Sequence, residues 1–182
     1  VVFPLMMLMA AIASPLIRVV ITAKWDACVP YLQIICFAMM WYPIHAINLN
    51  LLQVKGRSDL FLRLEIIKKV VGVSVMCVTI PLGVTAMCFG MVFSSMIALF
   101  INTYYTGKLI NVGYLTQMKD LLPIILISLL VSACAYASTW LFSTEWIKLF
   151  MAVVIGGIMY LILSIFFAKD EYIEVMNVIK RK

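Results

Sequence analysis

Five polar side chains lie inside or at the edges of long apolar runs, and they are the side chains of this chain best placed to do chemistry. They are Arg18, His45, Asn48, Asn50 and Gln53. A charge at mid-depth in a bilayer costs roughly 2.5–3.5 kcal/mol or more, so polar groups in spanning helices usually face a cavity or one another. Lining a hydrated lumen, these five would bind sugar hydroxyls and phosphate.

The alternative role for the same side chains is structural. Asn and Gln often hydrogen bond between helices in membranes, and the sequence favours this for the amides. Helical spacing places His45 and Asn48 on one face, and Asn50 and Gln53 on another. A lone histidine in a helix usually satisfies a neighbour, and Arg18 near the end of its run could extend to the interface as an anchor. Both roles stay open at this point.

Catalytic and metal-binding patterns are missing from the sequence. There is a single histidine, and no motif for a nucleophile elbow, a zinc protease or a phosphate loop occurs. The five cysteines form no Cys-x-x-Cys pair and are expected to be free packing residues. We therefore expect no enzyme, no catalytic residue, no metal site and no cofactor.

Six apolar runs must position these side chains. Hydrophobic residues make up 65% of the chain and charged residues 12%, against about 45–50% and about 25% in soluble domains. Each run is long enough to cross ~30 Å of hydrocarbon as a helix. The sequence predicts an all-α membrane protein with six transmembrane helices near 1–22, 30–53, 62–84, 87–106, 121–142 and 146–168.

Basic residues gather in alternate gaps between the runs. Eight of the fourteen lie between the second and third runs, between the fourth and fifth, or after the sixth, and three more, Arg63, Lys68 and Lys69, lie in the first turns of the third run. The positive-inside rule places those gaps and the C-terminus in the cytoplasm. The net charge of +6 is thus explained by topology, and nucleic acid is not an expected partner. Residues 169–182 are predicted to form a cytoplasmic amphipathic tail.

Several local signals predict where helices break, stop and start. Pro4 and Pro15 predict a kinked or broken first helix. Lys55-Gly56 reads as a helix stop, and Ser58 with Asp59 as the cap of the next helix. Residues 60–69 are interpreted as an interfacial extension of the third span. Consequently no Asp or Glu is expected in the middle of any span.

The stretch from Lys24 to Lys69 carries a family resemblance. It combines the segment 25–36 (Trp-Asp-Ala-Cys-Val-Pro-Tyr-Leu-Gln-Ile-Ile-Cys), a polar span, and the turn Gly56, Arg57, Ser58, Asp59. It resembles the C-terminal part of polysaccharide biosynthesis flippases of the Wzx type, in the multidrug/oligosaccharidyl-lipid/polysaccharide exporter superfamily. The resemblance covers the whole chain in hydropathy and about 45 residues in motif. Gly56, Arg57, Ser58 and Asp59 are expected to be structural residues of a cytoplasmic loop.

The resemblance implies an architecture and a substrate. Such proteins have twelve to fourteen spans in two bundles, like MATE transporters, and the six here would be the last six. The chain begins with Val-Val rather than Met, so a fragment lacking the N-terminal bundle is expected. The implied activity is flipping of undecaprenyl-diphosphate-linked oligosaccharide, used for O-antigen and other surface glycans, across the bacterial inner membrane.

Two other functions remain open on the sequence. A multidrug or cation antiporter of the same superfamily would need a buried carboxylate for coupling to the ion. A non-transporting assembly subunit of a membrane complex would need no lumen, and its His45 and Asn48 would lie at helix contacts. The partners expected in the first case are the bilayer, the lipid-linked oligosaccharide and the missing bundle.

Overall fold

The computed structural model describes residues 2–110 and 114–167, and all regular structure in these ranges is helical. The chain divides into two compact units, each described here by itself. Unit 1 combines the residues up to Val29 with those from Lys119 onward, and unit 2 is Pro30–Met118. The predicted tail 169–182 lies outside the described residues.

Unit 1 begins with a broken helix. Helix α1 covers Val2–Ala11 and α2 covers Ala13–Val20, and their axes differ by 71°. Pro15 explains the break, because proline has no N–H to donate to the carbonyl four residues earlier and its ring clashes there. The predicted interruption of the first span is therefore confirmed. The short 3-10 helix η1, Ala23–Cys28, follows.

The rest of unit 1 is a helical hairpin. Helix α7, Tyr114–Thr139, starts in unit 2 and continues into unit 1, and α8 is Glu145–Phe167. A small core of Ile12, Ala135 and Ala152 joins the broken helix to this hairpin. Small side chains there let the backbones approach, which is how helices pack in lipid without a hydrophobic driving force.

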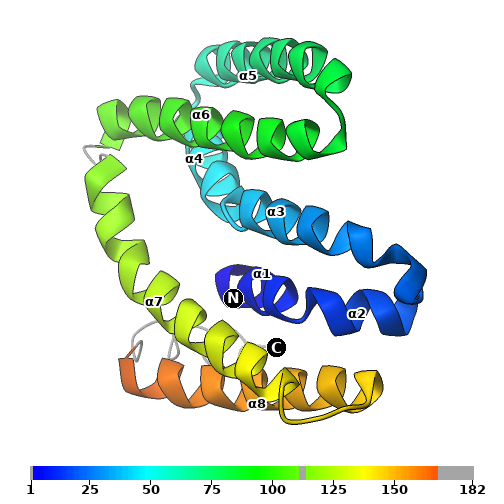
Figure 1. The fold of residues 1–182 in the computed structure, drawn as a ribbon. Helices are drawn as coiled ribbons and strands as arrows, with labels where there is room; N and C mark the ends of the chain where they lie inside the picture. Colours follow the sequence, from blue (N-terminus) through cyan, green and yellow to red (C-terminus); the bar gives the residue numbers. More distant parts are fainter. Residues whose placement is uncertain (1, 111–113, 168–182) are drawn as a thin grey trace. The chain divides into compact units, whose positions relative to one another are not determined.

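Unit 2 contains α3, Val29–Met39, and α4, Tyr42–Val54, which together form the second predicted run with a break before Pro43. Helix α5, Ser58–Thr79, then leads through η2, Ile80–Leu82, and a turn at Gly83 into α6, Val84–Ile110. Helices α5 and α6 lie side by side and run in opposite directions (Figure 1). The predicted hairpin at Pro81 and Gly83 is confirmed, with Gly83 at φ 95°.

The turn between α4 and α5 confirms one prediction and corrects another. Gly56 has φ 69°, its N–H donates to the Gln53 carbonyl, and the Arg57 N–H donates to the Leu52 carbonyl, which is the Schellman arrangement that ends a helix. However, Arg57 occupies the N-cap of α5 without a side-chain cap bond. Ser58 is already helical, so the predicted Ser58–Asp59 cap is wrong.

The number of helices able to span a membrane is smaller than predicted. By length and composition, four stretches in the described residues qualify: Ala23–Val54, Val84–Lys108, Tyr114–Thr139 and Glu145–Ile165. The bent pair α1–α2 adds a fifth when taken as one span. Helix α5, assigned to the third run, does not qualify. Its charged side chains, Arg63, Glu65, Lys68 and Lys69, fall within the helix rather than before it.

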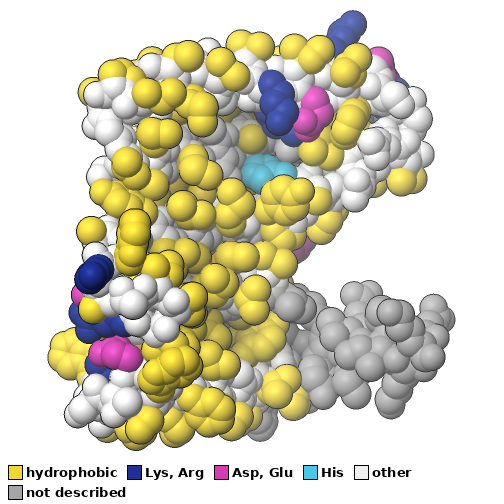
Figure 2. Space-filling model, turned by 90° about the vertical axis from the view of Figure 1, so that its right-hand side faces the viewer, with side chains coloured by type: hydrophobic (Ala, Val, Ile, Leu, Met, Phe, Trp, Pro, Cys, Tyr) yellow, Lys and Arg dark blue, Asp and Glu magenta, His cyan; other side chains and the backbone are white. Residues whose placement is uncertain are grey.

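The surface of the described residues is largely apolar. Large hydrophobic side chains of every long helix are exposed, among them Val78, Phe93, Leu126, Trp140 and Phe150. Figure 2 shows hydrophobic side chains over most of the visible face, with charged side chains confined to small groups. Such a surface suits contact with lipid and is rare on soluble monomers.

Candidate functional site

His45 of α4 belongs to a chain of hydrogen bonds that reaches α6. The Asn102 Nδ2 lies 3.4 Å from His45 Nδ1, and the His45 Nε2 lies 3.3 Å from the Ser95 Oγ. Because an amide nitrogen only donates, Nδ1 accepts, and the neutral imidazole carries its hydrogen on Nε2. Ser95 then donates to the Ala38 carbonyl at 3.2 Å. The histidine is thus satisfied on both ring nitrogens.

One turn further along α4, Asn48 makes a reciprocal amide pair with Gln117 of α7. Each side chain donates to the oxygen of the other at 3.2 Å. Asn48 also donates to the Thr103 hydroxyl at 3.4 Å, and Thr106 donates to the Asn48 carbonyl at 3.5 Å. We call His45, Asn48, Ser95, Asn102, Thr103, Thr106 and Gln117 the polar seam of unit 2.

Most of the polar seam is closed to solvent, and one of its atoms has no partner. Asn48 is 2% exposed and Asn102 is fully buried. The Asn102 Oδ1 finds no hydrogen-bond donor among the described residues. A buried acceptor left unpaired costs about 1–3 kcal/mol, so this oxygen is a place where a water or a ligand hydroxyl would gain energy.

The other two predicted amides are not part of the polar seam. Asn50 and Gln53 are exposed on α4, on the face predicted to differ from that of His45 and Asn48. The structure therefore brings together two of the five predicted site residues, at a helix contact. The role of either pair in binding a substrate stays a prediction.

A groove between α5 and α6 contains charged residues that the sequence reasoning did not select. Its volume is about 510 Å³, and its lining is mostly apolar, including Val73, Met76, Met87 and Met91. At one end it is lined by Glu65, Lys68, Lys69 and Ser94. Lys68 forms an ion pair with Glu65 and interacts electrostatically with His45. Lys69 is exposed and makes no ion pair within the described residues.

The residues of α6 that line the groove indicate how deep in the membrane the groove lies. Ser94 stands ten residues after Val84, the first residue of a candidate span. At 1.5 Å per residue that is about 15 Å, half of a ~30 Å hydrocarbon core. Along α5, Lys69, Lys68 and Glu65 stand 13, 14 and 17 residues before Leu82, so they lie about 20–26 Å from the turn at Gly83, in the half of a ~30 Å core farther from that turn. The interpretation of residues 60–69 as an interfacial extension stays a prediction, and so does the expected absence of an acidic residue from the middle of a span.

Arg18, the remaining predicted site residue, belongs to an ion-pair network in unit 1. Its guanidinium binds both oxygens of Asp26 at 2.8–3.1 Å and reaches the Glu145 Oε1 at 3.3 Å. Lys148 donates to the same Glu145 oxygen at 2.8 Å. Two cations and two anions balance, so the network has no net charge. It ties α2 and η1 to the first turn of α8.

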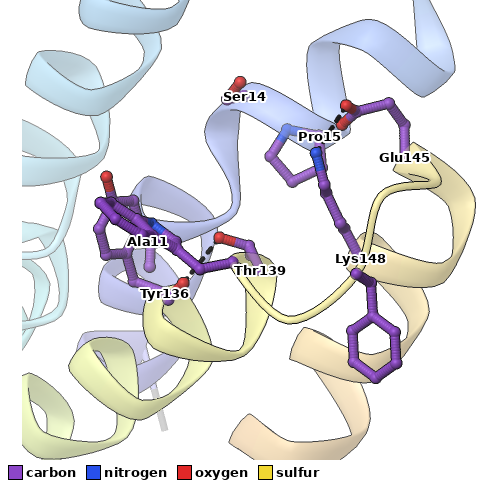
Figure 3. A pocket seen from close by; sticks show the side chains of 9 residues that line it. Ala11, Ser14, Pro15, Tyr136, Thr139, Glu145 and Lys148 are labelled. Carbon is purple, nitrogen blue, oxygen red and sulfur yellow. Dashed lines mark hydrogen bonds and ion pairs between the residues drawn. The ribbon is translucent and has the colours of Figure 1, made fainter.

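Beside this network lies a pocket of about 330 Å³. Figure 3 shows Ala11 of the broken helix beside Tyr136 and Thr139 of α7, and Pro15 beside the pair Glu145–Lys148, with Ser14 on the helix between them. Trp140 and Phe142 complete the lining. The pocket thus combines aromatic rings, hydroxyls and a neutralised ion pair.

The loop residues Gly56, Arg57, Ser58 and Asp59 act structurally in the turn between α4 and α5. The Arg57 guanidinium donates to both Asp59 oxygens at 3.1 and 3.2 Å. This hydrogen bonding lowers the pKa of Asp59 below its ordinary value and raises the pKa of Arg57. Asp59 also lies in the first turn of α5, where a negative charge opposes the helix dipole.

Contacts within each unit agree with the alternation of sides predicted from charge. Arg18, near the first gap, bonds to Glu145 in the fifth gap. Tyr31, also near the first gap, accepts a hydrogen bond from Thr85 in the third gap at 3.4 Å. All three gaps are assigned to the outer side. Asn48 and Gln117, at the ends assigned to the inner side, are also paired. Which side is cytoplasmic stays a prediction from the positive-inside rule.

Among residues 2–110 and 114–167, no group of three or more His, Cys, Asp or Glu side chains could hold a metal ion. Comparison with family models, with curated proteins and with solved structures finds no match for this chain. Helix length and hydropathy are those of an all-α, multi-pass membrane protein.

Proposed function

We propose that this chain is part of a transporter that moves undecaprenyl-diphosphate-linked oligosaccharide across the bacterial inner membrane. The observation that carries the proposal is the groove between α5 and α6, where two lysines lie at one end of a mostly apolar lining. Charged side chains beside a membrane-spanning helix are rare and usually belong to a substrate or ion path.

The groove has a charged end and an apolar end, which suit the phosphate headgroup and the hydrocarbon chain of a phospholipid-like substrate. Lys69 has no carboxylate partner within the described residues, so its ammonium is available to bind a phosphate oxygen. Lys68 is held by Glu65 and adds positive potential only when that pair opens. The valine and methionine side chains that continue the groove accept hydrocarbon. A diphosphate beside Lys69 with its lipid chain in the apolar part would fit this division.

The polar seam supports the same proposal from the next helix contact. Lys68 interacts electrostatically with His45, so the groove and the seam are neighbours within unit 2. Figure 2 shows the single histidine of the chain close to a basic and an acidic side chain on the visible face. The unpaired Asn102 Oδ1 is a buried acceptor that a water molecule could satisfy.

One observation favours the antiporter alternative. Glu65 is a carboxylate that lines the groove and has a lysine partner, and exchange of Lys68 for a proton or a metal cation at Glu65 would couple transport to an ion gradient. A Glu65→Gln variant that leaves glycan export unchanged and abolishes drug resistance would favour the antiporter. A non-transporting assembly subunit would require neither Glu65 nor Lys69.

The experiment compares two basic residues of α5. Lys69 lines the groove, whereas Arg63 is exposed on the same helix and does not line it. In cells, Lys69→Gln should accumulate lipid-linked oligosaccharide on the cytoplasmic leaflet and reduce surface glycan at unchanged protein level. Arg63→Gln, which also removes one charge, should export normally. Unchanged surface glycan on complete loss of the gene, together with increased drug sensitivity, would overturn the proposal.

A further inference from the structure

We propose that the pocket beside the broken helix of unit 1 binds one uncharged sugar unit of a glycan. This deepens the proposed function, on which it rests for the source of the glycan. The pocket is formed by α1, α2, α7 and the first turn of α8, and it does not share a residue with the α5–α6 groove.

The aromatic part of the pocket is exposed and therefore available to a ligand. Trp140 is 78% exposed and Tyr136 is 51% exposed, with their ring centroids 6.2 Å apart at 67°. The face of an aromatic ring carries partial negative charge, which attracts the weakly positive C–H groups on one side of a sugar ring. Two rings at an angle offer such a face together with an edge, which restricts how the sugar lies.

The polar part of the pocket supplies both donors and acceptors for hydroxyl groups. Ser14 makes no side-chain hydrogen bond within the described part of the chain. The Ala11 carbonyl has no helical donor, because the residue four positions later is Pro15. Breaks of this kind in spanning helices leave backbone groups that line binding cavities.

The charges around the pocket favour an uncharged ligand. Lys148 is bonded to Glu145 at 2.8 Å, and Glu145 also binds Arg18, which is held by Asp26. No cation of this network is left for a phosphate, and no carboxylate is left for an ammonium headgroup. A sugar hydroxyl needs neither, since it bonds to the outer lone pairs and N–H groups of a paired carboxylate and ammonium.

The size of the pocket limits the ligand to a small one. A volume of about 330 Å³ is at the lower end of the range of about 300–1,000 Å³ for small-molecule sites. It therefore accommodates a single unit rather than a whole oligosaccharide. Glu145 lies in the gap between the fifth and sixth runs, which is assigned to the outer side, and the pocket residues of α7 and α8 border that gap, where the glycan would arrive after transfer.

The test measures binding of free sugars to the protein in lipid nanodiscs by saturation-transfer NMR. The probes are galactose and N-acetylglucosamine, with dihexanoylphosphatidylethanolamine as the headgroup comparison. Trp140→Ala should weaken sugar binding by at least about tenfold, as loss of an aromatic anchor does. Trp146 is the matched control: it is 68% exposed at the start of α8 but does not line the pocket, so Trp146→Ala should bind as the unchanged protein does.

Three results would overturn the inference: no saturable sugar signal in the millimolar range, equal effects of the two tryptophan variants, or saturable binding of the phospholipid probe alone at this pocket. Tyr136→Leu provides a second variant with the same expected direction. If the protein binds no sugar at this pocket but Lys69→Gln still exports less glycan than Arg63→Gln, only the sugar site is rejected. If the protein binds sugar at this pocket but Lys69→Gln and Arg63→Gln export glycan equally, only the proposed transport function is rejected.

Discussion

At the scale of single residues, burial separates amides that the sequence treats alike. Asn48 is 2% exposed and makes hydrogen bonds to α6 and α7, whereas Asn50 two positions later is exposed. The sequence predicted that they lie on different faces, because helical periodicity is local. It did not identify Gln117 as the partner, because a contact across 69 positions depends on how the helices pack.

Asn48→Leu should destabilise the protein, because Gln117 and Thr103 lose a partner for their amide and hydroxyl groups. The expected loss is about 1–2 kcal/mol, between the average membrane hydrogen bond and a buried unpaired group. Asn50→Leu is the matched control and should change stability little. Thermal unfolding in detergent of both variants measures the difference. Equal effects of the two substitutions would contradict the buried placement of Asn48.

Asp59 should contribute a pH dependence confined to acid. Its folded pKa is lowered by the hydrogen bond from Arg57, so the contribution is fully present above the unfolded pKa of about 3.9. It is lost as the pH falls through the lower folded pKa. In Asp59→Asn, the unfolding temperature should depend less on pH below about 5 than in the unchanged protein. An identical pH profile for the two proteins would show that the Arg57–Asp59 pair does not form.

At the scale of elements, local chemistry predicted breaks and turns well. The break at Pro15, the stop at Gly56 and the turn at Pro81–Gly83 each follow from the backbone limits of proline or glycine. The N-cap of α5 was predicted wrongly, because Arg57 occupies that position and Ser58 is already helical without capping the helix. The depth of the α5 charges could not be predicted, because it depends on which part of α6 lies beside them.

Helix α5 packs closely on α6 at Gly90, and this contact leaves little room for an added methyl group. A Cβ at Gly90 would lie 2.9 Å from the Thr79 Cγ2 and 3.0 Å from the Val75 Cγ1. Both neighbours are β-branched and have little freedom to move away. Gly90→Ala should therefore cost about 1–3 kcal/mol through overpacking.

Gly72 provides the control for that prediction. It lies on α5 with nothing within 4 Å of an added Cβ. Gly72→Ala should be neutral or should stabilise the helix by up to about 1 kcal/mol. Chemical unfolding of the two variants gives the comparison, and a Gly90→Ala variant as stable as Gly72→Ala would contradict the close packing of α5 on α6.

At the scale of the whole molecule, composition identified the class of protein and overestimated the number of spans. Apolar runs are visible in the sequence, and four or five of them form helices suited to a bilayer. The third run does not qualify as a span because four charged side chains, Arg63, Glu65, Lys68 and Lys69, lie inside its helix α5. The ion-pair network of Arg18, Asp26, Glu145 and Lys148 was also missed, since its two halves are 127 positions apart at Arg18 and Glu145.

The predicted orientation in the membrane can be tested at four of the five gaps between the runs. In a background without the native cysteines, Leu82→Cys and Thr144→Cys should react with a membrane-impermeant maleimide in intact cells. Lys55→Cys and Lys108→Cys should react only after the membrane is opened, because basic gaps face the cytoplasm. Labelling of Lys55→Cys in intact cells would reverse or disprove the predicted orientation.

The most direct test of the proposed transport role is the transfer rate of a fluorescent undecaprenyl-diphosphate-linked sugar across the membrane of proteoliposomes containing the purified full-length transporter to which this chain is proposed to belong. The account predicts that the unchanged protein and Arg63→Gln transfer the lipid at the same rate. It predicts that Lys69→Gln is slower by at least about tenfold, the loss of roughly 1.4 kcal/mol of phosphate binding. Equal rates for Lys69→Gln and Arg63→Gln, or no transfer by the unchanged protein, would contradict it.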